Sequence, residues 1–377
     1  MRIVKLGNLV TVMNEREDNP SQSKYDHFVG LEHYDSGSVS ITRWGSTEML
    51  VSAMKVFHRG DILVARRNVY LKRASTVDFD GITSGDSIIL RVNDERYKAI
   101  VPFVLNTDSF WDYADQHSDG SMSKRLAPKT MLEYEFTLPD DEEVERLSTL
   151  LWAMERTKTA YKNLIAKTDE LVKSQFIEMV QPLLDAGNTV PLGELVETDR
   201  PITYGILKPG TGFPGGVPVV KVKDMKDGLI DQSDLLLTSP EIDNSYKRSR
   251  LQAGDLLISI RGSVGRMAEV PENLENANIT QDTARLTIKR EYNKVFIRGV
   301  LESQPLQHDM EKNIRGVAVK GINIGYLREL GIPVCCRSKQ DELAALYIQS
   351  DKSKFAAQQA LADLTATQKA LMRQYLG

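Results

Sequence analysis

One pattern occurs twice in this sequence, as Gly60-Asp61-Ile62-Leu63-Val64-Ala65-Arg66-Arg67 and as Gly254-Asp255-Leu256-Leu257-Ile258-Ser259-Ile260-Arg261-Gly262-Ser263-Val264-Gly265-Arg266. In both copies a Gly-Asp pair precedes an apolar run that is typical of a buried strand, and a basic turn follows it. The two aspartates are 255 − 61 = 194 residues apart, about half of the 377-residue chain. This spacing indicates an internal duplication.

Further matches support the duplication, because their offset grows steadily along the chain. The offsets are 193 − 7 = 186 for residues 4–10 against 190–196, 228 − 37 = 191 for 31–37 against 222–228, 282 − 86 = 196 for 86–90 against 282–286, and 371 − 171 = 200 for 163–173 against 363–373. Accumulated loop insertions produce such a drift, whereas chance matches would scatter. We expect residues 31–37 and 222–228 to be apolar strands that end in the turn glycines Gly37 and Gly228.

Each half of the sequence has a globular region followed by a long helix. The expected fold class is α+β, with two pseudo-repeated mixed α/β domains separated by two long helices that form an antiparallel coiled coil. Asp140 and Ser338 are the expected helix caps. The expected boundaries are residues 1–141 for the first domain, 142–181 for the first helix, 182–189 for a linker, 190–338 for the second domain and 339–377 for the second helix.

The two helices each carry an apolar stripe at the 3–4 spacing of one helix face. Stripes on both helices predict that the helices pair, as a rod that holds the two domains apart; the alternative is that each helix packs only on its own domain. The predicted seam residues are Leu147, Leu151, Met154, Tyr161, Leu164 and Leu171 in the first helix, and Leu343, Tyr347, Leu361, Leu364, Leu371 and Tyr375 in the second.

Composition limits the class of protein. Hydrophobic residues make up 41% and charged residues 27%, as in ordinary globular proteins. The net charge is −4, so any nucleic-acid binding must come from local basic clusters. The adjacent Cys335 and Cys336 form neither a disulfide framework nor a metal motif, which favours a reducing cytoplasm. Since no apolar run approaches the ~20 residues of a membrane span, we expect no membrane association.

Motifs of enzymes are missing from the sequence. There is no Walker phosphate loop, and the glycine-rich segment 210–216 contains Pro214 and reads as a surface loop. The nearest string to an adenine methyltransferase motif, Asp18-Asn19-Pro20-Ser21, lacks the second proline and the aromatic residue. The five histidines show no metal-ligand spacing. We therefore expect no catalytic residue and no metal in this chain.

The second Gly-Asp run is accompanied by Tyr204-Gly205-Ile206 and by the basic strand and turn 219–228. With these motifs, residues 190–333 resemble a target recognition domain of type I restriction-modification specificity subunits. The first half resembles the same domain less closely. It keeps Val4-Lys5-Leu6-Gly7 and Gly60-Asp61, but has residues 67–71 in place of Arg261-Gly262-Ser263-Val264-Gly265 and no counterpart of Tyr204-Gly205-Ile206.

The resemblance implies a non-catalytic subunit that reads double-stranded DNA. In that family each recognition domain reads one half of a bipartite site, the helices act as a spacer, and two DNA methyltransferase subunits dock on the assembly. ATP-dependent translocase-nuclease subunits join for restriction. On this reading S-adenosylmethionine and ATP with Mg²⁺ belong to the partner subunits, and the chain itself binds no cofactor.

Basic and aromatic residues near the two turns are the candidate DNA contacts, because arginine reads guanine and lysine suits phosphate. Taken singly, each is more typical of a solvated surface charge, whereas the set beside the turn glycines favours a DNA contact. They are Arg66, Arg67, Tyr70, Lys72 and Arg73 in the first half, and Tyr204, Lys221, Lys223, Tyr246, Lys247, Arg248, Arg250, Arg261, Arg266, Arg315 and Lys320 in the second.

Two other functions remain open at this stage. A protein-interaction scaffold without DNA sequence preference would suit the negative net charge. An enzyme with an unrecognised site would require turnover by this chain alone.

Overall fold

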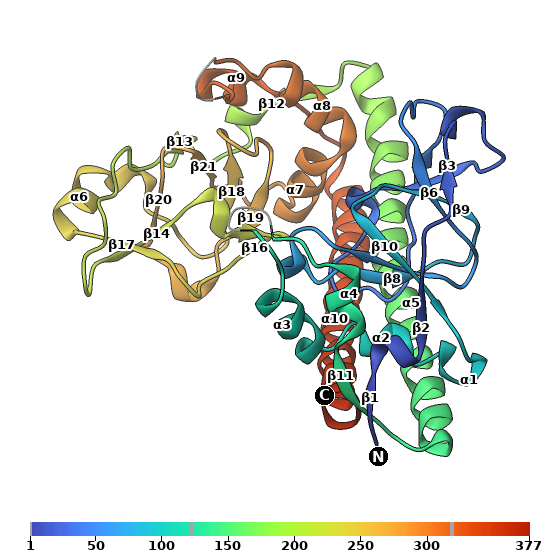
Figure 1. The fold of residues 1–377 in the computed structure, drawn as a ribbon. Helices are drawn as coiled ribbons and strands as arrows, with labels where there is room; N and C mark the ends of the chain where they lie inside the picture. The colour runs from blue at the N-terminus through green and yellow to red at the C-terminus, as the bar shows by residue number, and fades with distance from the viewer. Residues whose placement is uncertain (1, 121–123, 317–319) are drawn as a thin grey trace. The chain divides into compact units, whose positions relative to one another are not determined.

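The computed structural model describes residues 2–120, 124–316 and 320–377 (Figure 1). The chain divides into two compact units. The first unit contains Met1–Asn163 and Ala357–Gly377, and the second contains Leu164–Ala356. Each unit therefore holds one globular domain together with parts of both long helices.

The first unit is built around an antiparallel four-stranded sheet. Its strand order is β2 (Val10–Met13), β10 (Ser87–Val92), β7 (Ile62–Ala65) and β8 (Ala74–Thr76). A five-stranded sheet has the order β3 (Arg16–Glu17), β6 (Met54–Phe57), β9 (Gly81–Thr83), β4 (His27–Val29) and β5 (Gly45–Ser46), with β4 parallel to β9. β1 (Arg2–Lys5) pairs with β11 (Glu135–Leu138). The helices are α1 (Glu95–Lys98), α2 (Val101–Val104), α3 (Asp108–Gln116) and α4 (Pro128–Leu132).

The second unit repeats this plan. Its four-stranded antiparallel sheet has the order β13 (Thr203–Tyr204), β21 (Thr283–Leu286), β18 (Leu256–Ser259) and β19 (Met267–Glu269). A second sheet contains β17 (Leu236–Thr238), β14 (Val217–Val220) and β20 (Asn278–Ile279), with β14 parallel to β20. Two further pairs are β12 (Thr189–Pro191) with β22 (Gly331–Pro333) and β15 (Met225–Lys226) with β16 (Leu229–Ile230). The helices are α6 (Pro240–Ser245), α7 (Lys294–Glu302), α8 (Gln304–Lys312) and α9 (Ile324–Glu329).

The expected strand at residues 31–37 is wrong, and the one at 222–228 is right only for Met225–Lys226, which form β15; the expected turn glycines Gly37 and Gly228 both have positive φ, +70° and +78°. Both segments open with a single turn of 3₁₀ helix, Leu31–His33 and Val222–Asp224. In each case the side chain of the third residue accepts the backbone N–H that precedes the turn, from Gly30 to His33 Nδ1 and from Lys221 to Asp224 Oδ2, both at 2.9 Å. This local hydrogen bond competes with strand pairing and stabilises the turn.

The Gly-Asp pair has a structural role in both units. Asp61 accepts the backbone N–H of His58 at 2.8 Å, and Asp255 accepts that of Gln252 at 2.8 Å. Each buried carboxylate also binds an arginine, Arg91 at 2.8 Å for Asp61 and Arg200 at 2.9 Å for Asp255. The carboxylate thus fixes the turn that leads into the central strand, and its charge is paired.

The long helices are α5 (Asp141–Asp185) and α10 (Arg337–Leu376). Asp140 accepts the N–H of Glu143 at 3.0 Å, as expected for the cap of α5. Residues 182–185, which we assigned to a linker, are helical despite Pro182. The helix ends at Asp185, and Gly187 closes the turn that follows, because its positive φ of +69° allows its N–H to bind Leu184 O and that of Asn188 to bind Leu183 O. Ser338 lies within the first turn of α10, because this helix begins at Arg337.

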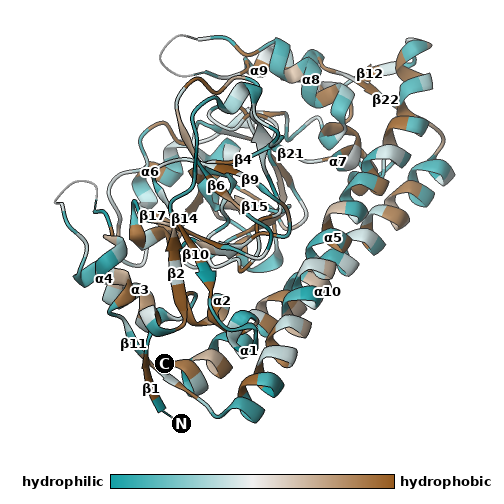
Figure 2. Cartoon of the chain, turned by 45° about the vertical axis from the view of Figure 1, so that its right-hand side comes forward, coloured by the Kyte–Doolittle hydropathy of each residue, from teal (hydrophilic) through white to brown (hydrophobic). Residues whose placement is uncertain are grey.

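The two helices pack against each other in antiparallel fashion (Figures 1 and 2). In the first unit the early part of α5 shares a core with the end of α10, through Leu147, Leu151, Met154, Leu364, Leu371 and Tyr375. In the second unit the end of α5 shares a core with the start of α10, through Phe176, Val180, Leu343 and Tyr347. The end of α10 thus packs on the first domain rather than its own, which excludes the alternative of two separately packed helices.

Part of the predicted seam is wrong. Leu164 and Leu171 leave 51% and 61% of their surface exposed. In this part of α5 the half-buried residues are Tyr161, Ile165 and Val172. The buried face of the helix therefore contains these residues and not the two leucines. Polar pairs also join the two helices. Lys158 donates to Gln368 at 2.9 Å in the first unit, and Lys354 pairs with Asp169 at 2.7 Å in the second.

We predict that replacing Asp255 with alanine lowers the free energy of unfolding by about 3–5 kcal/mol, because Arg200 and the Gln252 N–H lose their buried partner. Asp255→Asn keeps the shape but not the charge and is expected to cost less. Asp234→Ala, at a carboxylate whose side chain is 91% exposed, is the control and should change little. Urea denaturation of the purified chain measures all three, and equal stabilities for Asp255→Ala and Asp234→Ala would contradict the structural role.

A second prediction concerns the turn after β7. Asn68 has φ = +55°, and at the matching position of the second unit Gly262 has φ = +72°. Asn68→Gly should therefore leave the melting temperature unchanged or slightly raised, whereas Asn68→Val should cost about 1–3 kcal/mol, because β-branched residues are strained at positive φ. Thermal unfolding followed by circular dichroism measures both variants. An unchanged melting temperature for Asn68→Val would show that the turn adopts another conformation.

Candidate nucleic-acid interface

In the first unit, a loop returns to the end of β7 and pairs with it. Asp119 and Arg125 exchange backbone hydrogen bonds of 3.1 and 2.9 Å, which closes the loop. Its far end is held by two further backbone bonds, from Leu126 N to Arg66 O at 2.8 Å and from Asn68 N to Lys124 O at 3.1 Å. We call the described residues 119–120 and 124–125 the first return loop.

The second unit contains the same construction at the end of β18. Arg315 and Gly321 exchange hydrogen bonds of 2.8 and 3.0 Å. Ile322 N binds Ile260 O at 2.9 Å, and Gly262 N binds Lys320 O at 3.2 Å. The described residues 315–316 and 320–321 are therefore the second return loop, at an offset of 315 − 119 = 196 from the first. The duplicated sheets thus place two equivalent loops beside two equivalent basic turns.

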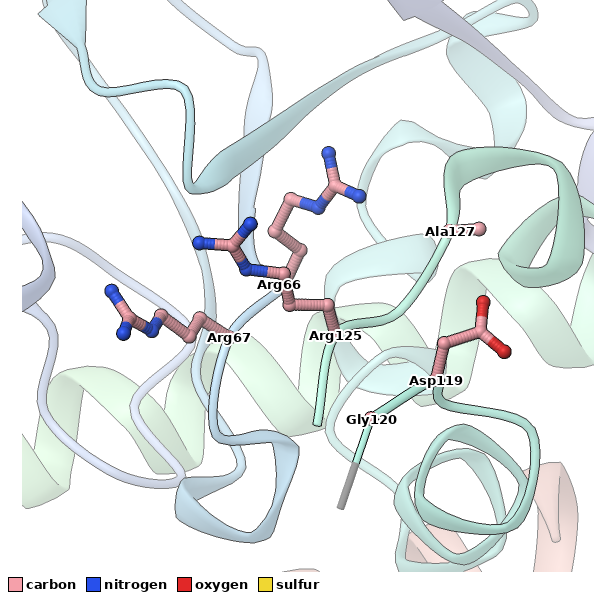
Figure 3. A pocket seen from close by; sticks show the side chains of 6 residues that line it. All are labelled: Arg66, Arg67, Asp119, Gly120, Arg125 and Ala127. Atoms are coloured by element: carbon pink, nitrogen blue, oxygen red, sulfur yellow. The ribbon is translucent and has the colours of Figure 1, made fainter. Parts of the chain in front are cut away.

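Three arginines meet at the first return loop. Arg66, Arg67 and Arg125 line a cavity of about 420 Å³, into which Asp119 also faces (Figure 3). Arg67 and Arg125 lie 3.6 and 3.5 Å from the carboxylate of Asp86. The Nε atom of Arg66 is buried and has no hydrogen-bond partner among the described residues. The cluster therefore carries more positive charge than its own carboxylates neutralise.

Other cations reinforce this charge. Lys55 donates to Ser87 O at 2.9 Å, and burial together with the nearby Arg66 and Arg16 lowers its pKa. Lys55 lies directly opposite Arg16 in the β3–β6 pair. A set of like charges held close together favours binding of an anion such as a phosphate, and the guanidinium groups also match the edge of guanine.

The second return loop has a different set of side chains. Ile260 occupies the position of Arg66, and it is buried. Arg261 donates to Gln281 at 3.0 Å and lies 3.9 Å from Asp282, so the arginine–aspartate pair of the first unit is kept. Arg315 and Lys320 are exposed on the loop. This site is polar but carries fewer clustered charges than the first.

The Tyr204-Gly205-Ile206 motif lies beside Gln281. Gln281 N binds Ile206 O at 2.9 Å, and a side chain at Gly205 would come within 1.9 Å of Ile279 O. Glycine is therefore required for this close approach. Tyr204 stays 44% exposed at the edge of the sheet.

The structure separates the remaining candidates of the first unit. Tyr70 is 68% exposed, which leaves its ring available to a ligand. Lys72 pairs with Asp108 at 2.6 Å on the surface. Arg73 donates to the backbone oxygens of Leu31 and Arg67 at 3.0 Å each, and burial lowers its pKa. We assign Arg73 a structural role, because its guanidinium group is used within the protein.

The remaining candidates of the second unit also fall into two groups. Lys247 and Arg248 are exposed, Tyr246 and Lys221 are half-buried, and Lys223 pairs with Asp234 at 3.3 Å. Arg250 instead binds Asp243, whose side chain is buried, with Nε at 2.8 Å. Arg266 donates to the backbone oxygens of Val222 and Met225 at 3.2 and 3.1 Å. Arg250 and Arg266 therefore have partners within the second unit, although Arg266 stays exposed, and a DNA contact by either residue remains a prediction.

Sequence reasoning missed four polar residues of these sites: Arg16, Lys55, Arg125 and Gln281. The sequence does contain one indication of the first return loop, which is a match to the second. Asp119-Gly120 and Lys124 match Arg315-Gly316 and Lys320 with the same spacing, and both glycines have positive φ, +102° and +110°. Arg16 and Lys55 carry no such signal, since only strand pairing brings them together.

The described residues contain neither a metal-binding cluster nor a membrane-spanning helix. No group of three or more His, Cys, Asp or Glu side chains in the described ranges is placed to hold a metal ion. No described helix is long and apolar enough to cross a membrane.

Comparison with known proteins gives a consistent set of relatives. No family model matches the chain. The specificity subunit of the type I restriction enzyme EcoBI from Escherichia coli is 31% identical over 194 residues, which is 49% of this chain and 40% of that protein. The alignment thus spans less than half the length of this curated relative.

Solved structures match over nearly the whole chain. The S subunit of a type I restriction-modification system from M. genitalium has a TM-score of 0.59 and 13% identity, with 100% of this chain and 96% of that one covered. A chain from a structure of the type I R-M system, solved to explain complex assembly and conformational transition, has a TM-score of 0.55 and 20% identity, with 99% and 97% covered. The resemblance predicted from the sequence is thereby confirmed: this chain has the fold of the specificity subunits of type I restriction-modification systems and is related in sequence to one of them.

Proposed function

We propose that this chain is the DNA-recognition subunit of a type I restriction-modification complex and has no catalytic activity of its own. The observation that carries the proposal is the repeated site. Two return loops, each held to a strand end by the same backbone hydrogen bonds, present arginine and lysine in both units. A duplicated binding site is what a bipartite DNA sequence requires.

The chemistry of the first site suits a base or phosphate contact. Arg66 lines the cavity, and its Nε has no hydrogen-bond partner among the described residues, so an incoming acceptor meets an unused N–H group there. Arginine binds guanine O6 and N7 as a bidentate pair. With a net charge of −4 the chain as a whole does not attract DNA, so we expect modest affinity until methyltransferase subunits complete the complex.

We further propose that α5 and α10 set the distance between the two DNA contacts. Both helices begin in one unit and end in the other. The polar pairs Lys158–Gln368 and Lys354–Asp169 restrict the register in which the helices pair, because a shift would leave buried polar groups without partners. Half-sites about one turn of DNA apart, ~34 Å, would suit two contacts on one face of the duplex.

The partners follow from this function. Two DNA methyltransferase subunits would supply the chemistry and bind S-adenosylmethionine, and translocase-nuclease subunits would bind ATP with Mg²⁺. One of the structural relatives comes from a structure that describes complex assembly of a type I R-M system. Such a complex would act in the cytoplasm.

A protein-interaction scaffold is the second candidate function, and the negative net charge together with exposed apolar residues on the helices, such as Leu164 and Phe355, favours it. A scaffold would show no DNA sequence preference. Gel-shift of the chain with its co-purifying partner, on specific and scrambled duplexes, separates the two functions.

We predict that Arg66→Ile weakens DNA binding without loss of stability, because isoleucine is the residue that the second unit uses at this position. A lost base contact should cost about 1–3 kcal/mol and relax one half of the motif, whereas a lost phosphate contact should lower the salt slope of log K by about 1. Arg59→Ala, an exposed arginine at the other end of β7, is the control. Wild-type affinity and salt slope in Arg66→Ile would remove this cavity from the DNA interface.

We also predict that lengthening the spacer changes the recognised site. The variant carries one heptad inserted after Asn163 in α5 and a matching heptad before Ala357 in α10. Modified adenines are then mapped in DNA exposed to the chain and its methyltransferase. We expect unchanged half-sites at a new separation, or loss of modification if the complex cannot span the DNA.

A chain with the same two heptads added after Gly377 controls for length. Unchanged half-site spacing in the inserted variant would refute the spacer role. A wild-type map without any two-part motif would refute the recognition function itself.

A further inference from the structure

An aromatic side chain stands on a glycine-rich loop of the second unit that the DNA site described above does not include. Phe213 is 47% exposed and is flanked by Gly212 on one side and Pro214 on the other. A single exposed apolar side chain is common on protein surfaces, so a role for this ring depends on how it is held and on what lies beside it. The loop comprises residues 207–216, and Leu207 at its start is 49% exposed.

The loop is held rigidly. Phe213 N binds Leu237 O of β17 at 2.9 Å, and Gly216 N binds Phe213 O at 2.9 Å, which closes a turn with Pro214 and Gly215 in its centre. Gly215 has φ = +71°, as this type of Pro-Gly turn requires. A side chain at Gly216 would lie 2.1 Å from Thr238 O, so the turn is pressed against the sheet. Phe213 is therefore presented at low entropic cost.

Cations lie beside the ring. Phe213, Lys221 and Lys223 line one cavity of about 500 Å³, together with Leu235, Leu236 and Leu237 of the neighbouring strand region. Asp234 also lines the cavity and pairs with Lys223 at 3.3 Å, while no described ion pair involves Lys221. An apolar ring with lysines next to it fits a duplex, because the ring enters the base stack while the lysines face phosphates.

The loop continues directly from the DNA site of the second unit. Its first residue follows Ile206, whose carbonyl oxygen accepts the N–H of Gln281, and Gln281 accepts a hydrogen bond from Arg261. The segment of the first unit that precedes β4 is different. It contains the 3₁₀ turn Pro20–Gln22 and exposes no large apolar side chain, and the exposed Trp44, Met49 and Val51 of this unit lie around β5 instead. An exposed aromatic ring at this position is thus a feature of the second unit.

We propose that Phe213 is a wedge that enters the minor groove of double-stranded DNA, unstacks one base step and bends the duplex in the half-site bound by the second unit. This inference rests on the proposed function. Lys221 holds the adjoining phosphate. Specificity for that half-site then depends in part on how easily its bases unstack, so flexible pyrimidine–purine steps are favoured over stiff A-tracts at the wedge position.

The test uses the full chain in complex with its methyltransferase and a short duplex that carries the mapped bipartite site. Energy transfer between dyes at the two ends reports the bend, and 2-aminopurine placed at successive steps of each half-site reports unstacking. Phe213→Ala should lose the bend and the 2-aminopurine signal in one half-site only, with affinity reduced by about 10-fold. Phe213→Leu keeps an apolar wedge and should retain part of both signals.

Phe355→Ala is the matched control, since this phenylalanine is 59% exposed in the same unit but lies on α10. A full bend with Phe213→Ala would overturn the wedge. Loss of methyltransferase assembly with the bend retained would also overturn it and would make the loop a protein contact. If the wild-type complex binds no bipartite site at all, the proposed function fails, and that result differs from failure of the wedge alone.

Discussion

The pairing of a strand end with a returning loop is the interaction on which both binding sites depend. A buried carboxylate, Asp61 in one unit and Asp255 in the other, fixes the turn before the central strand. The strand then delivers Arg67 or Arg261 to its far end, where the backbone of a return loop binds it. Since these hydrogen bonds involve only the main chain, the side chains at the same positions can change without loss of the site. The proposed role in DNA recognition would make use of this property, since the target can then vary while the fold is kept.

The two copies show how far such change has gone. Ile260 stands where the first unit has Arg66, and Gly262 stands where it has Asn68, whose φ is positive. The backbone hydrogen bonds between strand end and return loop are preserved. The first site therefore concentrates positive charge, and the second combines a few polar groups with an exposed aromatic loop. The helices keep an equivalent contact, because Lys158 binds Gln368 in one unit and Lys354, which lies 354 − 158 = 196 residues later, binds Asp169 in the other. We infer that duplication supplied the scaffold and that divergence supplied two different half-site preferences.

Sequence patterns predicted the duplication, the fold class, the paired helices and the turns that carry the arginines, because periodicity and Gly-Asp turns are local signals. They failed where the burial or the contacts of a residue depend on residues that are distant in the sequence. Leu164 and Leu171 fit a heptad but are exposed, since the paired surface follows other positions. Arg73, Arg250 and Arg266 look like surface cations in sequence but bind groups of their own unit. Arg125 reaches the site through a long-range bridge that no local pattern reveals.

The most direct test of the two-site account is photocrosslinking from one position in each unit. A benzophenone amino acid replaces Tyr70 beside the first site or Arg315 on the second return loop, and the methyltransferase complex is irradiated on its bipartite DNA. The account predicts that position 70 crosslinks to one half-site and position 315 to the other. Crosslinks from both positions to the same half-site, or efficient modification of the DNA with no crosslink from either, would contradict it.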